Sequence, residues 1–195
     1  MTGSTLNMHY TIADPKTFGI SEYEPVLPIY HSGQPEDRKE HCSDLLHRLD
    51  RIDPDRLSPE NAYTYRLLHR SLENDLALAD FPYYNEPLSP SSGMQSQLPV
   101  LLAEYTFRTK RDVTDYLALL DQIDDYFASL LLYEQEKAAA GFFMPACSSE
   151  KVRKQCDTIV TTEELAQGTH FLQTTFEDRL SELQKQGLFT PEETA

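Results

Sequence analysis

Six histidines are the side chains of this sequence most able to hold a metal ion. They are His9, His31, His41, His47, His69 and His170. Only Asp44 and His47 form a carboxylate-x-x-His pair, the spacing that di-iron helical bundles use twice. A bridged site would need more acids at matching heights on other helices, and the acids here fall on the predicted solvent faces. We therefore interpret the histidines as surface residues and predict no metal site in this chain.

Nucleophilic chemistry is also not supported by the motifs. The sequence has no Gly-x-Ser-x-Gly elbow and no Gly-rich phosphate loop. Cys42 stands between His41 and Ser43, but neighbouring residues of a helix point about 100° apart and do not face each other. Since Cys42 also lies on an apolar stripe, we predict a small core residue and assign no catalytic residue.

The loop around residues 82–97 carries the residues that could contact a peptide. It is rich in Pro, Ser, Tyr and Gln, and loops of this length inside a domain are usually functional or interfacial. Gly93 permits close approach of a backbone, while Gln95 and Gln97 offer both donors and acceptors. These three residues are the candidate substrate-cleft residues, with plain packing of the loop on a core as the competing interpretation.

The elements that must position these residues are helices. Apolar residues recur at helical spacing from Pro35 to about residue 52, and Ser58-Pro59-Glu60 starts a helix that Pro82 stops. A Thr109 and Asp112 capping box opens a long helix that ends near Gly141. Further helices follow from Ser148 or Ser149, and through residues 172–183 to Gly187. We expect an all-α antiparallel multi-helix bundle with roughly 60 to 70 percent helix.

The predicted organisation is an extended arm over residues 1–34, a helical domain over residues 35–189 and the start of a helix over residues 190–195. The arm is suggested by the alternation of Leu6, Met8, Tyr10 and Ile12. Thr190-Pro191-Glu192-Glu193 repeats the helix-start pattern seen at residues 58–60. Because an isolated turn is unstable, we interpret the chain as the front part of something longer, with an apolar face exposed where the rest packs.

Composition excludes several partners. Acidic residues outnumber basic ones by 32 to 17, so the net charge is −15, and nucleic acid or an anionic membrane would repel this surface. Apolar runs are short, so we predict no membrane span. Three cysteines indicate reduced thiols, and the start lacks signal-peptide features. A cytoplasmic location is the default, with the cell envelope or secretion expected if an upstream signal was trimmed.

Short motifs spread along the chain resemble one bacterial family. They are the stretch Leu88-Ser-Pro-Ser-Ser-Gly-Met-Gln-Ser-Gln-Leu-Pro99 with its Gly-x-Gln element, Phe107-Arg-Thr-Lys-Arg-Asp-Val-Thr-Asp-Tyr-Leu117, residues 137–141 and residues 151–159. The opening, with Asp14-Pro15 and Phe18-Gly-Ile20, is similar too. The chain thus resembles the N-terminal region of the family catalogued as domain of unknown function 885.

That resemblance implies a part of a gluzincin-type zinc metallopeptidase-like protein whose His-Glu helix motif lies in its second half. We therefore expect a non-catalytic N-terminal helical part that walls the substrate cleft and supports a missing zinc-binding half. Zinc and a peptide substrate would belong to the complete protein. The alternative is a stand-alone helical protein-interaction module. An independent hydrolase or di-iron enzyme needs chemistry that these residues do not assemble, and self-association through an exposed apolar face is a further candidate.

Overall fold

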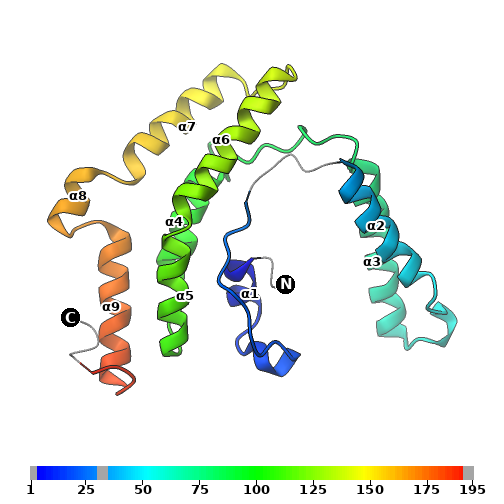
Figure 1. Ribbon diagram of the computed structural model, residues 1–195, viewed down its shortest axis with the longest axis horizontal. Coiled ribbons are helices and arrows are strands. Elements are labelled where there is room, and N and C mark those ends of the chain that lie inside the picture. The colour runs from blue at the N-terminus through cyan, green and yellow to red at the C-terminus, as the bar shows by residue number, and fades with distance from the viewer. Residues whose placement is uncertain (1–3, 30–34, 191–195) are drawn as a thin grey trace. The chain divides into compact units, whose positions relative to one another are not determined.

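The computed structural model describes residues 4–29 and 35–190, with the backbone alone for Pro35 and Glu36. Helix makes up 67% of the structure, and the described ranges contain no strand. The predicted all-α class is therefore confirmed. The chain divides into two compact units, which are described separately (Figure 1).

Unit 1 comprises Met1–Tyr30, Glu86–Glu134 and Phe143–Ala195. Its helices are α1 (Thr5–Thr11), the 3-10 turn η1 (Pro15–Phe18), α4 (Met94–Glu104), α5 (Lys110–Leu120), most of α6 (Ile123–Ala139), α7 (Ala146–Ile159), α8 (Thr162–Gln167) and α9 (Phe171–Lys185). Helix α4 packs against both α7 and α9. Unit 2 comprises His31–Asn85 and Gln135–Phe142, and holds α2 (Pro35–Leu49), η2 (Pro54–Arg56) and α3 (Pro59–Leu78).

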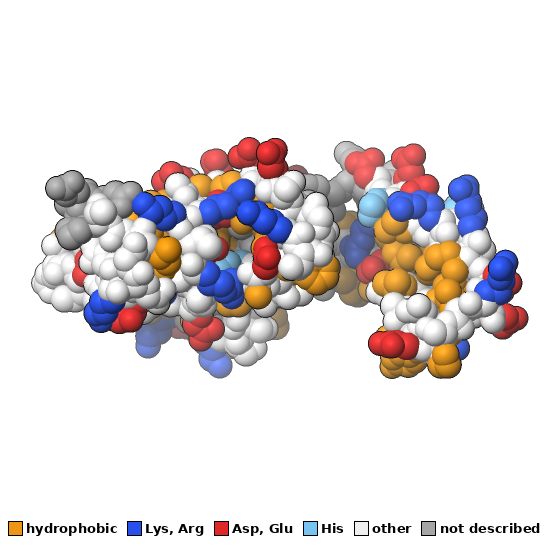
Figure 2. Space-filling model, turned by 90° about the horizontal axis from the view of Figure 1, so that it is seen from below, with side chains coloured by type: hydrophobic (Ala, Val, Ile, Leu, Met, Phe, Trp, Pro, Cys, Tyr) orange, Lys and Arg blue, Asp and Glu red, His pale blue; other side chains and the backbone are white. Residues whose placement is uncertain are grey.

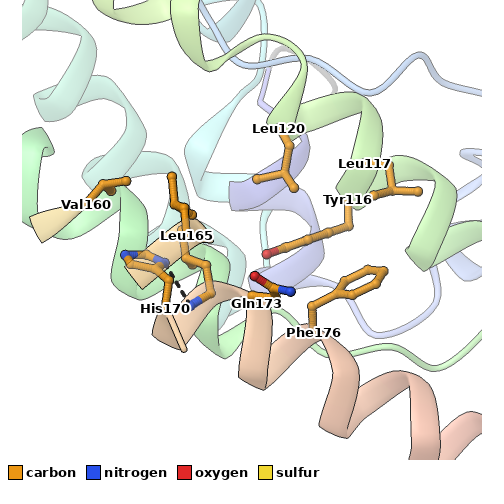
Figure 3. Close-up of a pocket in the computed structure, with 9 residues that line it drawn as sticks. Tyr116, Leu117, Leu120, Val160, Leu165, His170, Gln173 and Phe176 are labelled. Atoms are coloured by element: carbon orange, nitrogen blue, oxygen red, sulfur yellow. Dashed lines mark hydrogen bonds between the residues drawn. The ribbon is translucent and has the colours of Figure 1, made fainter. Parts of the chain in front are cut away.

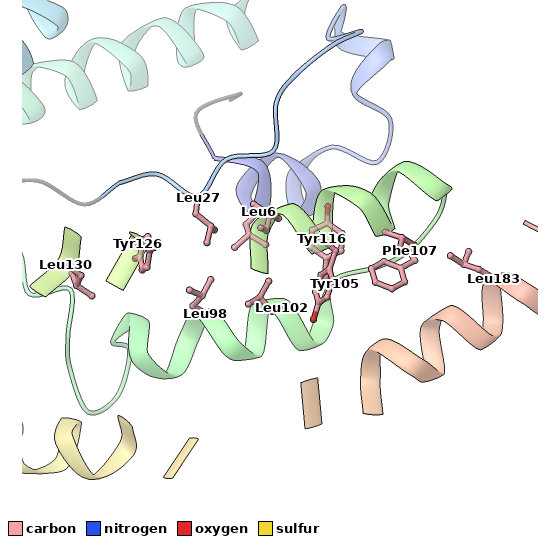
Figure 4. Close-up of a cluster of buried hydrophobic side chains, with 12 residues drawn as sticks. Leu6, Leu27, Leu98, Leu102, Tyr105, Phe107, Tyr116, Tyr126, Leu130 and Leu183 are labelled. Carbon is pink, nitrogen blue, oxygen red and sulfur yellow. The ribbon is translucent and has the colours of Figure 1, made fainter. Parts of the chain in front are cut away.

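The hydrophobic core belongs to unit 1 and is built around α4 and α5. Leu98 and Leu102 of α4 face Leu27 and Leu6 across the core (Figure 4). An aromatic group of Tyr105, Phe107, Tyr116 and Phe176 continues it, with ring centroids 5.4 to 6.1 Å apart. Such edge and stacked contacts add to the free energy of apolar burial.

Helix signals in the sequence are largely confirmed. Ser58 caps α3 by accepting from the amide of Asn61, and the Thr109 and Asp112 capping box opens α5. Gly187 follows α9 with φ of +74°, a left-handed conformation that favours glycine. Local side-chain chemistry at these ends is strong enough to set them without tertiary help.

The predicted loop over residues 82–97 is wrong at its end, because α4 already begins at Met94. The helix contains Pro99, which removes one backbone donor and normally disfavours a helix interior. Gln95, Leu98, Leu102 and the following Tyr105 are all buried and recur at helical spacing. Burial of this face outweighs the cost of the proline. The helical spacing of these residues was visible in the sequence, but Pro99 argued against a helix.

The predicted extended arm over residues 1–34 is also corrected in its first part. Ser4 caps α1, which buries Thr5, Met8 and His9 at helical spacing, and a non-helical segment over residues 20–29 follows η1. Thr5 holds that segment, since its hydroxyl accepts from the amide of Val26 at 2.7 Å. The spacing of these apolar residues is compatible with both an extended segment and a helix. Packing against the core favours the helix.

The predicted long helix from Thr109 is interrupted between Leu120 and Ile123. Gln122 lies in the break, accepts from the amide of Leu27 at 2.9 Å and donates to the carbonyl of Pro25 at 2.9 Å. The break therefore holds residues 25–27 against the junction of α5 and α6. The predicted single domain over residues 35–189 is likewise two units, and the predicted helix start at residues 190–195 lies outside the described residues apart from Thr190.

Candidate functional site

The three residues predicted to line a cleft do not share one surface. Gln95 is 2% exposed, and its amide nitrogen donates to the carbonyl of Ser89 at 2.7 Å and to Oε1 of Gln155 at 2.9 Å. Gln155 in turn donates to the carbonyl of Pro90 at 2.9 Å. Gln95 thus holds the loop before α4 against α7. For this residue the structure favours packing of the loop over contact with a peptide.

Gly93 is buried under the same loop and lacks room for a side chain. A Cβ there would lie 2.2 Å from the amide nitrogen of Ser89, so the backbone would have to move. Gln97, in contrast, is exposed on α4. Of the three candidates, only Gln97 presents its side chain to solvent.

The prediction that the histidines lie on the surface is wrong for His9 and His170, which are buried because each packs against an aromatic ring. His9 is buried, stacks on Tyr105 with centroids 3.7 Å apart and places Nδ1 3.7 Å from Oδ1 of Asp112. Burial, with a contribution from the Arg108 guanidinium, lowers the pKa of His9 although Asp112 acts to raise it. In unit 2, Nε2 of His69 lies 3.2 Å from Oδ1 of Asp50. Within residues 4–29 and 35–190, no group of three or more His, Cys, Asp or Glu is arranged to hold a metal ion.

The cysteines show no site either. Cys42 is 5% exposed on α2, as expected of a core residue, whereas Cys147 and Cys156 are exposed free thiols. Partial burial of the Cys156 thiol, with a contribution from the nearby Asp157 carboxylate, raises its pKa, so the reactive thiolate is disfavoured there.

Arg179 is a key residue that the sequence analysis did not identify. From α9 it donates to three carbonyls at the end of α4, those of Leu102 (3.4 Å), Ala103 (2.6 Å) and Tyr105. These are the groups that a helix leaves without partners at its C-terminus, where the dipole is negative. Arg179 therefore caps α4 from a neighbouring helix. No local sequence motif predicts such a contact, because Arg179 is far from α4 in the sequence.

An apolar groove lies between the helices of unit 2. It encloses about 390 Å³ and is lined by Leu45, Arg48, Leu49, Ile52, Leu68, Ser71 and Leu72. Figure 2 shows apolar side chains gathered on the hairpin of α2 and α3, bordered by both basic and acidic ones. We call the surface formed by these lining residues the hairpin face.

The hairpin itself buries very little. Among its described residues, Cys42 and Ala79 are the only buried apolar side chains. Leu67, Leu68 and Leu78 of α3 are each at least half exposed. Ion pairs between Arg38 and Asp75 (3.4 Å) and between Lys39 and Asp80 link the region of α3 to α2, but exposed pairs contribute little stability.

Comparison with known proteins gives one match. A family model described as a bacterial protein of unknown function (DUF885) matches residues 16–192. The chain belongs to this family. No curated protein and no solved structure matches it.

Membership in DUF885 agrees with the resemblance seen in the sequence. Zinc chemistry does not fit the residues described in this DUF885 chain, because they provide no three-ligand cluster, and we derive no catalytic step through a metal. In the described part of the chain, no helix has the length and apolar character to span a bilayer. The hairpin face is thus the feature of the family member that most needs a functional explanation.

The sequence held a partial signal for the exposed apolar surface of this hairpin. Tyr63, Leu67 and Leu78 of α3, and Phe81 just after it, are exposed apolar residues outside the lining of the groove. A helix with apolar residues on two sides normally has two packing partners. These additional exposed residues therefore predict a further packing partner for this hairpin.

Proposed function

We propose that this DUF885 member is a non-catalytic N-terminal helical part of a metallopeptidase-like protein. In this proposal the hairpin face packs against the zinc-binding part of that protein and helps to wall its substrate cleft. The observation that carries the proposal is the uncovered apolar surface of a two-helix unit with almost no core of its own.

The physical argument concerns the stability of the hairpin. Isolated helices are marginal in water, and most helical stability in proteins comes from packing an apolar face. Each large apolar side chain that becomes fully buried contributes about 1.5–3 kcal/mol. Leu67, Leu68 and Leu78 leave much of that free energy unrealised while they are exposed. A helical partner laid on the hairpin would recover it.

In the complete protein, the zinc ligands and the general base would come from the partner region. The loop before α4 and the first turn of α4 would take part in the cleft wall, with Gln97 of that turn as the residue able to contact a peptide. Gln95 would act by holding this loop against α7, through its 2.9 Å hydrogen bond to Gln155.

The alternative function is a stand-alone interaction module that binds a separate protein through the same hairpin face. The exposed aromatic group of Phe81, Tyr84 and Phe142 favours it as well, since aromatic residues are enriched at interfaces. The coding sequence downstream of Ala195 separates the two functions. A downstream His-Glu helix motif supports the first, whereas a stop codon directly after Ala195 supports the module.

Two charge-adding substitutions on α3 test the docking role. Leu68→Glu places a carboxylate on the hairpin face, and Ala77→Glu places one on another exposed side of the same helix. In the complete protein we expect Leu68→Glu to lower the free energy of unfolding by about 2 kcal/mol and to reduce peptide hydrolysis, with Ala77→Glu near wild type.

The same pair is then measured in the isolated chain. There, Leu68→Glu is expected to change stability by no more than about 0.5 kcal/mol, since Leu68 is already half exposed. Equal destabilisation in the isolated chain would mean that this face packs within the chain itself, and the proposal would be wrong.

A further inference from the structure

A second apolar groove lies in unit 1, between α5 and the segment that carries α8 and α9. It encloses about 330 Å³, within the size range of ligand sites. The lining residues are Tyr116, Leu117, Leu120, Val160, Leu165, His170, Leu172, Gln173 and Phe176 (Figure 3). Leu117, Val160 and Leu165 are each more than 40% exposed. The surface they form is called the α5–α9 groove below.

The walls of the α5–α9 groove are held in place by hydrogen bonds. His170 is 1% exposed, and its Nδ1 accepts from the amide of Leu172 at 3.3 Å. Its Nε2 therefore carries the proton and donates to the carbonyl of Ile159 at 2.9 Å. One side chain thus joins the end of α7 to the start of α9. The groove is preorganised, which lowers the entropic cost of binding.

The sequence around the groove is strongly acidic. Residues 112–124 and 156–178 include every lining residue and contain no Lys or Arg. They hold nine acids, namely Asp112, Asp115, Asp121, Asp124, Asp157, Glu163, Glu164, Glu177 and Asp178. Cations lie directly beside these ranges: Arg111 pairs with Asp115, Lys154 precedes the second range, and Arg179 donates to carbonyls of α4.

Two contacts show how these acids relate to the groove. Oε1 of Glu177 accepts from the amide nitrogen of the lining residue Gln173 at 3.2 Å. Asp121 follows Leu117 by four residues at the end of α5, so the two share a side of the helix. Several of the nine acids already have partners: Asp115 contacts Arg111 and Tyr23, Asp112 belongs to the capping box, Asp157 pairs with Arg153, and Glu164 accepts from the Thr161 hydroxyl.

We propose that the α5–α9 groove binds a basic amphipathic helix of another protein. Its apolar side chains enter the groove, and its Lys or Arg residues meet the acidic surroundings. Laying an apolar helix face into a groove between helices is a recurrent mode of peptide recognition. Opposite charges around the contact select the partner and speed its association. This inference concerns unit 1 alone and does not depend on the docking role of the hairpin face.

A binding experiment with a model peptide tests this proposal. The peptide is labelled with fluorescein, has about 14 residues, and carries leucines at helical spacing and lysines on the opposite face. Two companion peptides replace the lysines by glutamates or the leucines by glutamines. Fluorescence anisotropy with the whole chain is expected to show binding of the first peptide, weakening as NaCl rises from about 50 to about 200 mM. Both companions should bind at least roughly tenfold more weakly.

Paired variants locate the site. Leu117→Ser with Leu165→Ser changes the groove, whereas Leu131→Ser with Leu132→Ser changes two somewhat more exposed leucines of α6 outside it. We expect roughly tenfold weaker binding for the first pair and less than about twofold for the second. Circular dichroism checks that both remain folded.

Equal effects of the two pairs would show adsorption to an acidic surface and would overturn the proposal. The proposal would also fail if the glutamate peptide bound as tightly as the lysine peptide. Sedimentation supplies a third criterion. Self-association of the chain that disappears in the Leu117 and Leu165 variant would make the groove a contact between copies instead.

Discussion

The side-chain amide of Gln95 donates from Nε2 to Oε1 of Gln155 across a distance of 2.9 Å. This bond joins α4 to α7, and the same nitrogen also holds the loop through the carbonyl of Ser89. Oε1 of Gln95 is buried without a hydrogen-bond partner. Gln95 has an amide that could bind a peptide, but these contacts show that it instead holds α4, α7 and the loop together.

Gln95→Ala should therefore destabilise the chain, by about 1–3 kcal/mol, because the partly buried Gln155 and the carbonyl of Ser89 both lose a donor. Gln97→Ala is the matched control, and its exposed side chain should matter by no more than about 0.5 kcal/mol. Urea unfolding followed by circular dichroism gives both values. Similar stabilities of the two variants would contradict the fastening role.

Arg179→Met should cost about 2–3 kcal/mol, since it leaves carbonyls at the end of α4 without their charged donor. Arg153→Met provides the control. Arg153 is exposed on α7 and its ion pair is with Asp157 at 3.7 Å, a surface pair of little value. Thermal unfolding should separate the two variants clearly, and equal melting temperatures would refute the capping role.

Tyr116→Phe should leave stability unchanged or raise it by up to about 1 kcal/mol. The Tyr116 hydroxyl is buried without a hydrogen-bond partner, and burial raises its pKa, so it stays protonated at neutral pH. Deleting an unpaired polar group removes its desolvation cost while the ring contact with Phe176 remains. A loss above about 1 kcal/mol in urea unfolding would reveal an acceptor for this hydroxyl.

His9 should make the chain less stable as the pH falls below about 6.5. Its pKa is lowered in the folded chain, first by burial, so the unfolded chain binds more protons between the folded pKa and 6.5. The stability contribution is complete above the unfolded pKa and decreases toward the folded one. Unfolding free energies at about pH 7.5 and about pH 5.5 measure this loss. The loss should be smaller in His9→Gln, and an identical loss would assign the pH dependence to other groups.

The sequence alone determined the helical class and the helix ends that carry their own capping chemistry. Ser58 and the pair Thr109 and Asp112 act on amides within three residues, so no distant contact is needed to set them. Cys42 was also placed correctly in a buried position, because the spacing of its neighbours defines the apolar side of α2. Local periodicity and local hydrogen bonds can be predicted from sequence because the interacting residues are close together in the chain.

Tertiary structure decided the rest. Pro99 stays helical because Leu98 and Leu102 are buried in the core, and Thr5–Thr11 is helical because Met8 and His9 are buried together. Gln95 became internal only when α7 was placed beside α4, bringing Gln155 within 2.9 Å across 60 residues of sequence. Such contacts depend on which faces meet, and a local pattern carries no information about residues that distant.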